Sequence, residues 1–128
     1  MSTRVALDTS ALMMPVELDV RLFDELERLI GSAELVAPQP VIEELRRLSE
    51  KGGTEGTAAS VGHDLATERC LVVDTEESYA DDALVELARE GSVDYVVTND
   101  RPLGDRVLEA SIPVLALRGR NKLAITQP

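Results

Sequence analysis

The stretch Val5-Ala6-Leu7-Asp8-Thr9-Ser10 places a carboxylate and two hydroxyl groups directly after a short apolar run. The apolar run predicts a buried β-strand, with Asp8 at its carboxyl end. In an open parallel sheet the carboxyl ends of the strands form the crevice that binds ligands, so an acid at this position is placed for chemistry. Alternatively, Asp8 only caps the following helix, a common role for aspartate. The rest of the chain has to decide between these two interpretations.

The composition is typical of one globular domain. The chain has 128 residues, of which 44% are hydrophobic, and no apolar run approaches the roughly 20 residues that a membrane-spanning helix needs. The N-terminus leads directly into a strand pattern and lacks the organisation of a signal peptide. We therefore expect residues 1–128 to form a single domain in the cytoplasm, with no membrane contact.

Cysteine and histidine are too scarce for a zinc site or a Cys-His nucleophile. The chain contains one of each, Cys70 and His63, and Cys70 opens an apolar run that is typical of a buried strand. Any metal site in this protein is therefore expected to use oxygen ligands.

The charge is distributed unevenly along the chain. The formal net charge is −11, which is unusual for a protein that binds nucleic acid. Residues 101–128, however, carry five basic and two acidic side chains, a balance of +3, whereas residues 1–100 carry −14. We therefore predict that the basic group near the C-terminus contacts phosphate. That group comprises Arg118, Arg120 and Lys122.

Strand and helix patterns alternate along the chain. Strands are expected at residues 4–7, 34–37, 71–73, 94–98 and 113–117, with a short edge at 123–125, and amphipathic helices at 22–30, 41–48, 57–68, 79–90 and 101–110. Residues 13–15 and the Gly-rich residues 51–56 are expected to be loops. Asp19 is expected to cap the first of these helices and Gly31 to end it. The alternation predicts a three-layer α/β fold with a mostly parallel sheet.

Acidic residues recur at the connections from these strands to the following helices. Asp8, Glu44 and Asp100 each lie in such a connection or in the helix that it feeds, as does the pair Asp81 and Asp82. Parallel strands end at the same edge of a sheet, so these acids can share one site. At about 100° per residue, Glu44 and Asp81 flank the apolar stripes of their helices, whereas Asp82 points farther away.

A cluster of such carboxylates needs a counter-ion. Two carboxylates 4 Å apart repel each other by about 4 kcal/mol at an effective dielectric constant of 20. Oxygen ligands without cysteine or histidine select hard cations, so Mg²⁺ or Mn²⁺ is the expected occupant. Such an ion activates water and neutralises phosphate oxygens, which favours hydrolysis of a phosphodiester.

Four short motifs, taken in order, resemble those of the PIN-domain nucleases. The motifs are VALDTSAL at residues 5–12, PVIEEL at 40–45, YADDALV at 79–85 and VTND at 97–100. The ending IPVLALRGR at 112–120 is similar to an archaeal branch that lies close to the eukaryotic nuclease for small-subunit ribosomal RNA and to the VapBC toxins. The resemblance covers the full chain.

The resemblance assigns roles to individual residues. It implies a catalytic, metal-binding quartet of Asp8, Glu44, Asp82 and Asp100. The register of residues 82–85 selects Asp82 over Asp81, against the helix geometry. Supporting roles around the metal are expected for Thr9, Ser10, Asp81, Thr98 and Asn99. Ser10 stands where the family often has asparagine. The family fold has a five-stranded sheet in the order 3-2-1-4-5, which brings Asp8 close to Asp100.

The function that the resemblance implies is that of a Mg²⁺- or Mn²⁺-dependent endoribonuclease leaving a 5′-phosphate and a 3′-hydroxyl. It acts in ribosomal RNA processing or as a VapC-like toxin, often as a homodimer, with an antitoxin or a ribosome-maturation protein as a possible partner. Two alternatives remain open: a non-catalytic PIN module that binds RNA, and a magnesium-dependent phosphohydrolase or phosphoacceptor of another family. Ser10 stands where haloacid-dehalogenase-type enzymes have a second aspartate. Aromatic residues make up only 2% of the chain, which favours recognition of RNA through its backbone or shape.

Overall fold

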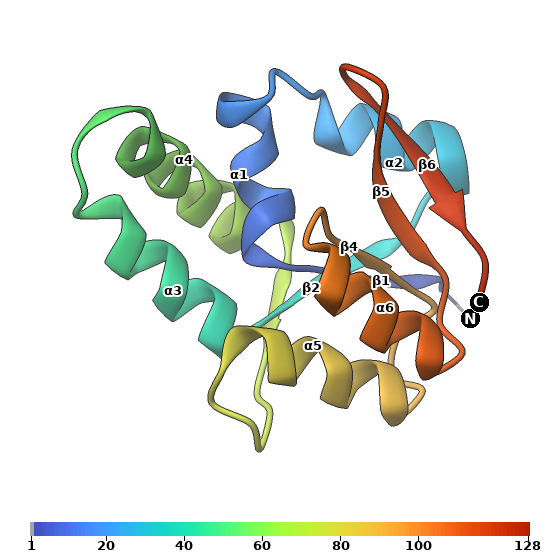
Figure 1. Cartoon of the computed structure of the whole chain (residues 1–128). Helices are drawn as coiled ribbons and strands as arrows, with labels where there is room; N and C mark the ends of the chain where they lie inside the picture. Colours follow the sequence, from blue (N-terminus) through green and yellow to red (C-terminus); the bar gives the residue numbers. More distant parts are fainter. Residues whose placement is uncertain (1) are drawn as a thin grey trace.

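A six-stranded sheet in the order β3-β2-β1-β4-β5-β6 runs through the protein (Figure 1). The computed structural model describes residues 2–128. The strands are β1 (Arg4–Leu7), β2 (Glu34–Pro38), β3 (Leu71–Val73), β4 (Tyr95–Val97), β5 (Val114–Arg118) and β6 (Lys122–Thr126). The first five are parallel in the expected order, and β6 pairs antiparallel with β5. The expected mostly parallel α/β sheet is confirmed. It has six strands rather than the five that the resemblance implies, because the short edge expected at residues 123–125 is the longer strand β6, which pairs with β5 as a hairpin.

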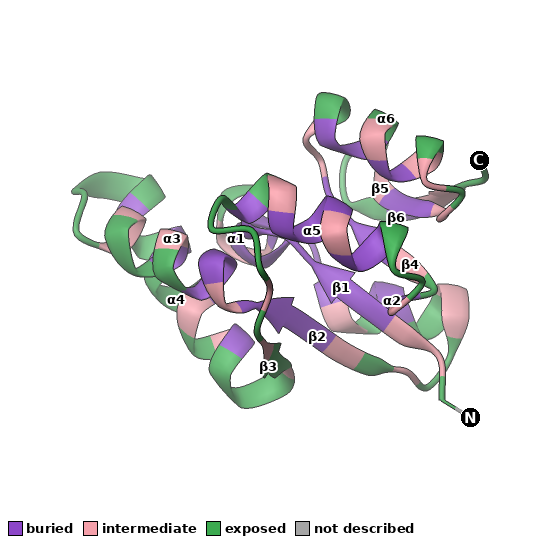
Figure 2. Cartoon of the chain, turned by 90° about the horizontal axis from the view of Figure 1, so that it is seen from below, coloured by how far each residue is buried: buried purple, intermediate pink, exposed green. Residues whose placement is uncertain are grey.

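Six helices accompany the strands. They are α1 (Thr9–Glu17), α2 (Leu22–Ile30), α3 (Gln39–Ser49), α4 (Gly53–Arg69), α5 (Ala80–Arg89) and α6 (Arg101–Glu109). Helix α5 packs on β1, β2 and β4, and α2 packs on β6. Figure 2 shows that buried residues are concentrated in the central strands and on the helix faces that turn toward them. The central strands are therefore covered on both faces, which explains their continuous apolar sequences.

Residues 13–15 and 53–56, both expected to lie in loops, are helical. Residues 13–15 belong to α1 because Asp8 caps that helix, and because Met13 and Met14 are buried in the core. Helix α4 begins at Gly53, whose φ of +72° lets the chain turn sharply into the helix. Local composition indicated a chain break in both places, and tertiary packing overrides it.

The structure confirms the expected last residue of α2 but not its expected N-cap. Gly31 ends the helix with a φ of +71°, as predicted. Asp19 does not cap it, since Asp19 itself has a φ of +52° and Arg21 occupies the N-cap position without a side-chain hydrogen bond. The chain therefore needs two more residues than expected to turn from α1 into α2.

Small residues allow α4 to lie close against α1. Four buried positions of α4 are Ala58, Ala59, Gly62 and Ala66. A Cβ atom on Gly62 would lie 2.8 Å from the carbonyl oxygen of Leu12 and 3.2 Å from a methyl carbon of Leu45. Helix α1 begins at Thr9, directly after Asp8, so this contact also fixes the helix that leads away from the candidate site.

We predict that Gly62→Ala destabilises the protein by about 1–3 kcal/mol, because the added methyl group overlaps the backbone of α1. Gly52→Ala is the matched control, since no atom lies within 4 Å of its added Cβ. Urea denaturation of both variants measures the difference. Equal midpoints for the two would contradict the close helix contact.

The β5–β6 hairpin is held against α2 by a partly buried ion pair. Glu25 accepts a hydrogen bond from the backbone N–H of Leu123 at 2.9 Å and pairs with Arg28 at 2.7 Å. The Arg28 guanidinium also donates to the carbonyl oxygen of Leu123 at 3.0 Å. The hydrogen bonds from Arg28 and Leu123 lower the pKa of Glu25 to about 2. These contacts anchor the start of β6 and so orient the hairpin.

No helix in residues 2–128 is long and apolar enough to cross a membrane. The cytoplasmic location and the assignment of the whole chain to one domain stay predictions.

Candidate functional site

A pocket of about 320 Å³ opens at the carboxyl ends of β1 and β4. It is lined by Thr9, Ser10, Met13 and Leu48, and by six acidic residues, namely Asp8, Glu17, Glu44, Glu55, Asp81 and Asp100. These acids come from segments spread over more than ninety residues of sequence. We call this cavity the acidic pocket. Three of the four acids of the expected quartet meet there.

Asp8 lies buried at the bottom of the acidic pocket. Its carboxylate accepts hydrogen bonds from the Thr98 hydroxyl, from the Ser10 hydroxyl at 2.8 Å and from the Ala11 N–H at 2.8 Å. Burial raises the pKa of Asp8 to about 6, although these hydrogen bonds lower it. The bond from Ala11 is a helix cap, so Asp8 caps α1 and lines the pocket at the same time.

Thr98 connects Asp8 to Asp100. Its hydroxyl oxygen donates to Asp8 and accepts the N–H of Asp100 at 2.9 Å. Asp100 in turn caps α6 by accepting the N–H of Leu103 at 3.0 Å. The two acids at the ends of the neighbouring strands β1 and β4 are therefore held by one hydroxyl group, which is itself buried.

Ser10 and Asn99 extend this network to β5. The Ser10 hydroxyl oxygen accepts the N–H of Asn99 at 3.0 Å, and the Asn99 side-chain oxygen accepts the N–H of Leu117 at 2.8 Å. The ends of β1, β4 and β5 are thereby tied together. Both polar residues hold the backbone around the pocket, which fits their expected supporting roles.

The structure places Asp81, and not Asp82, in the acidic pocket. Asp82 pairs with Arg106 of α6 at 3.0 Å and lines a separate hollow on the surface between α5 and α6. Asp81 has a raised pKa, first because of partial burial and then because of the negative charges of Asp100 and Glu44. The helix geometry, which favoured Asp81, agrees with this placement. The register inferred from the resemblance favours Asp82 instead, and the choice between the two as metal ligand stays a prediction.

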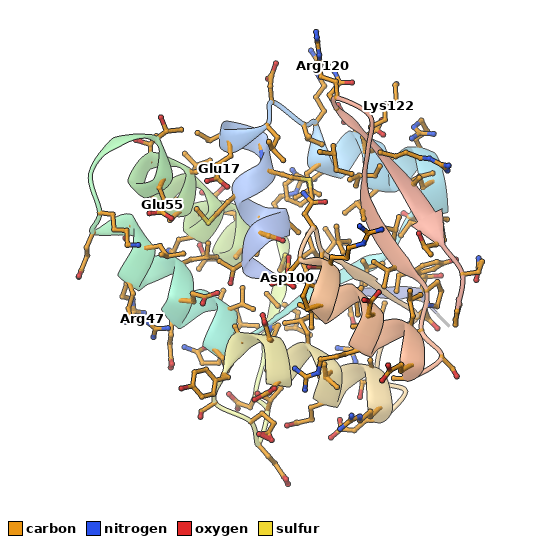
Figure 3. The ribbon with its side chains drawn as sticks, viewed as in Figure 1. Glu17, Arg47, Glu55, Asp100, Arg120 and Lys122 are labelled. Atoms are coloured by element: carbon orange, nitrogen blue, oxygen red, sulfur yellow. The ribbon has the colours of Figure 1, made fainter. Side chains whose placement is uncertain are left out.

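Glu17 and Glu55 are pocket residues that the sequence did not single out. Glu17 lies at the end of α1, and Glu55 in the first turn of α4 pairs with Lys51 at 3.3 Å. Figure 3 shows both on the same side of Asp100. Neither follows a strand, so no sequence signal distinguished them from other surface acids. The packing of α4 on α1 brings them to the pocket.

The acidic pocket has the chemistry of a hard-cation site. Its charged groups are all carboxylates, and the Thr9 hydroxyl is buried there without a hydrogen-bond partner in the described residues. Within residues 2–128, no three carboxylate, histidine or cysteine side chains already converge as a ligand set. The acids encircle the pocket instead, and the partly exposed Glu44, Asp81 and Asp100 can rotate toward an ion next to the fixed Asp8. The residues therefore fit a divalent cation.

The basic group lies on the β5–β6 hairpin, beyond the acidic pocket. Arg118 is three residues past Leu115, which pairs with Val97, so it stands about 10 Å past the end of β4 at a rise of ~3.3 Å per residue. Figure 3 shows Arg120 and Lys122 at the tip of the hairpin, well separated from Asp100. The three cations project from the same edge of the sheet as the acids without lining the pocket.

The family of the chain follows from comparison with known sequences. The profile of the family described as "PIN like domain" matches residues 5–120, which include all the acids of the pocket. The chain belongs to the PIN-like domain family. The resemblance of the four sequence motifs is thereby confirmed.

Several known proteins match nearly the whole chain in sequence or in structure. Ribonuclease VapC4 of Methanocaldococcus jannaschii is 30% identical over 125 residues, which is 95% of either chain. The solved structure of the PIN domain endonuclease Utp24 has a TM-score of 0.79 at 23% identity and covers 98% of this chain and 92% of that one. VapBC2 of Rickettsia felis, solved with a DNA fragment from its promoter, has a TM-score of 0.66 at 14% identity, over 91% and 100% of the two chains. The two structures show the same fold.

We predict that Asp8→Asn stabilises the protein at pH 7.5 in a chelator, by up to about 3 kcal/mol. The pKa of Asp8 is about 6 in the fold against 3.8 for the free side chain. Because the pKa is raised in the fold, the contribution of Asp8 to the free energy of unfolding is most favourable below pH 3.8, where its carboxyl group is protonated. That contribution is lost as the pH rises through 6. Urea denaturation between pH 3.5 and 8 measures the effect.

The stability gain of Asp8→Asn should disappear near pH 3.5, where the wild-type carboxyl is protonated. Asp64→Asn, at an exposed position of α4, serves as the control and should give no comparable gain. A wild-type protein that is more stable than Asp8→Asn at pH 7.5 would contradict the cost assigned to the buried carboxylate.

Proposed function

We propose that this PIN-like protein is a metal-dependent endoribonuclease that hydrolyses RNA phosphodiesters with Mg²⁺ or Mn²⁺. The observation that carries the proposal is the meeting of Asp8, Glu44, Asp81 and Asp100 around one pocket at the carboxyl edge of the sheet. These carboxylates repel one another at neutral pH, and a cation bound among them would offset that repulsion. The 30% identity with a protein named a ribonuclease, over nearly the full length of both chains, supports the same activity.

The proposed ligand set differs from the quartet that the sequence motifs imply. Asp81 takes the place of Asp82, which is engaged with Arg106 outside the pocket. Asp8, Glu44 and Asp100 keep the roles expected for them. The proposed catalytic residues are therefore Asp8, Glu44, Asp81 and Asp100.

Asp8 and Thr98 have different roles in the proposed site. A bound divalent cation supplies charge neutralisation at the phosphate and an activated water. Asp8 provides a carboxylate whose position is fixed beforehand by Thr98, Ser10 and Ala11. Because this ligand does not have to reorganise, it can hold the cation in place while negative charge develops on the phosphate. Thr98 also holds the backbone of Asp100, so it is a positioning residue for two ligands.

The RNA is proposed to approach from the side of the β5–β6 hairpin. Arg118, Arg120 and Lys122 place three cations within five residues of sequence on the β5–β6 hairpin. Attraction to phosphate is long-ranged and independent of sequence. These side chains can therefore guide an RNA backbone toward a protein whose net charge is otherwise strongly negative.

The biological substrate and the partners stay predictions. Similarity to a protein named VapC4 favours a toxin-like role with an antitoxin, and the fold shared with Utp24 leaves ribosomal RNA processing with a maturation partner as the second candidate. A homodimer is also predicted. A non-catalytic RNA-binding module is less well supported, because a binding surface alone does not require carboxylates from four segments at one pocket.

We predict that Asp81→Asn lowers the rate of RNA cleavage at least about a hundredfold, whereas Asp82→Asn leaves it within about threefold of wild type. The two neighbouring aspartates form a matched pair, since each variant loses one charge at the start of α5. Cleavage of a 5′-labelled RNA is measured with Mg²⁺, with Mn²⁺ and with a chelator. Activity should be lost in the chelator.

Two outcomes would contradict the proposal. Loss of activity in Asp82→Asn with normal cleavage by Asp81→Asn would restore the register inferred from the motifs. Failure of wild-type protein to cleave any RNA with either ion, while the fold is intact, would favour a non-catalytic module.

We also predict that Arg120→Gln weakens RNA binding and reduces its dependence on salt. Each lost phosphate contact should lower the slope of log K against log salt by about 0.7 to 0.9. Arg47→Gln is the control, because Figure 3 places Arg47 on α3, away from the hairpin. Fluorescence anisotropy with a labelled RNA at several salt concentrations measures the slopes. Equal slopes for the two variants would exclude the hairpin as the phosphate contact.

A further inference from the structure

A second cavity adjoins the acidic pocket on the other side of Asp100. It has a volume of about 370 Å³ and lies between α6 and β5. Asp100 lines both cavities. Thr98 lines only this one, and its hydroxyl donates to Asp8 and accepts the N–H of Asp100. We call it the α6–β5 pocket. A molecule that occupied it would lie directly next to a phosphate held at the acidic pocket.

Small side chains keep this pocket open. Gly104 is a buried residue in the middle of α6 and lines the pocket. A glycine within a helix costs about 0.5–1 kcal/mol relative to alanine. An added Cβ would only reach ordinary contact, 3.8 Å from Val114 and 3.9 Å from Thr98. Close packing therefore does not require the glycine, and its effect on the structure is to leave room in the pocket.

The lining combines apolar side chains with a few polar groups. Leu108, Val114 and Leu117 form the apolar part. The side-chain oxygen of Asn99 accepts the N–H of Leu117, which fixes the amide and leaves its NH₂ group without a partner in residues 2–128. Asp105 adds an acceptor at the rim. Pockets of roughly 300–1,000 Å³ with apolar side chains and a few polar groups are typical binding sites for small organic molecules.

Charge favours this side of the acidic pocket for a polyanion. On the opposite side, Glu17, Glu44 and Glu55 line the acidic pocket and repel phosphate. The α6–β5 pocket is lined by fewer acids, Asp100 and Asp105, and by the exposed Arg101. An RNA chain with one phosphate at the acidic pocket is therefore directed over the α6–β5 pocket.

We propose that the α6–β5 pocket binds the base of the nucleotide next to the phosphate that is cleaved. The proposal rests on the proposed endoribonuclease function and specifies its substrate. A base can enter such a pocket only if it is not paired or stacked in a helix. The nucleotide whose base enters the pocket is therefore unpaired while the RNA is bound.

The first test measures binding without cleavage. The methyl signals of Leu108, Val114 and Leu117 are followed by NMR in the metal-free protein, during titration with AMP, CMP, GMP or UMP. Ribose 5-phosphate, which lacks the base, is the control ligand. At least one nucleotide should shift these signals saturably and ribose 5-phosphate should not. No shift with any nucleotide, or equal shifts with ribose 5-phosphate, would overturn the proposal.

The second test measures the contribution of the base to cleavage. Once the cleaved bond in a short RNA is mapped, the nucleotide on either side of it is replaced by an abasic residue. On one side the replacement should lower kcat/KM by about tenfold or more, the usual scale for losing a group from an apolar pocket. Unchanged cleavage with both abasic substrates would overturn the base pocket while leaving the endoribonuclease intact.

Variants connect the effect to the pocket. Gly104→Leu fills the cavity, so it should abolish the methyl shifts and remove the difference between intact and abasic RNA. Gly52→Leu adds the same side chain at a position where no atom lies within 4 Å of the added Cβ. This variant should keep the methyl shifts and the difference between intact and abasic RNA. If Gly104→Leu does not fold, Gly104→Ala should fold and weaken nucleotide binding. If wild type cleaves no RNA, the proposed function fails and the nucleotide titration still decides whether the pocket binds a base.

Discussion

The parallel pairing of β1 with β4 is the constraint on which the site depends. It aligns Leu7 with Val97, so the next residue of each strand, Asp8 and Thr98, meets the other across ninety positions of sequence. Their hydrogen bond forms in the buried interior, where an unpaired hydroxyl or carboxylate would be costly. From this pair the network continues to Asp100 and Ser10. The ends of two central strands are thereby made rigid where the proposed chemistry takes place.

The same contacts show how the fold accommodates the ionised carboxylate of Asp8, whose burial destabilises the protein. Burial raises the pKa of Asp8, so the ionised carboxylate is less stable inside the protein than in water. The protein reduces this cost by using the acid as a helix cap and by surrounding it with hydroxyl donors. Asp100 combines a cap with a place in the pocket in the same way. Structural and functional roles of these two aspartates are therefore not alternatives, because one carboxylate can accept a backbone N–H and still face the pocket.

Much of the architecture was predictable because it depends on local patterns. Apolar runs such as residues 5–7 and 96–97 marked the buried strands, and the amphipathic pattern of residues 22–30 marked α2. The segment at 13–15 was mispredicted because a proline normally interrupts a helix, whereas Pro15 lies inside α1 here. The start of α4 was missed because glycine is poor in helices in general, whereas here Gly53 and Gly62 are selected by a sharp turn and by a close helix contact.

The sequence by itself determined that this is a mostly parallel α/β protein of the PIN-like family and that acids follow its strands, because strand periodicity and the residues at strand ends are local properties. Only the tertiary structure decided which acids share a pocket. Asp81 and Asp82 are neighbours in the chain, yet about 100° of helix rotation separates one that faces Asp100 from one that pairs with Arg106. Glu17, Glu55 and the α6–β5 pocket likewise arise from contacts between distant segments, and no local pattern encodes such contacts.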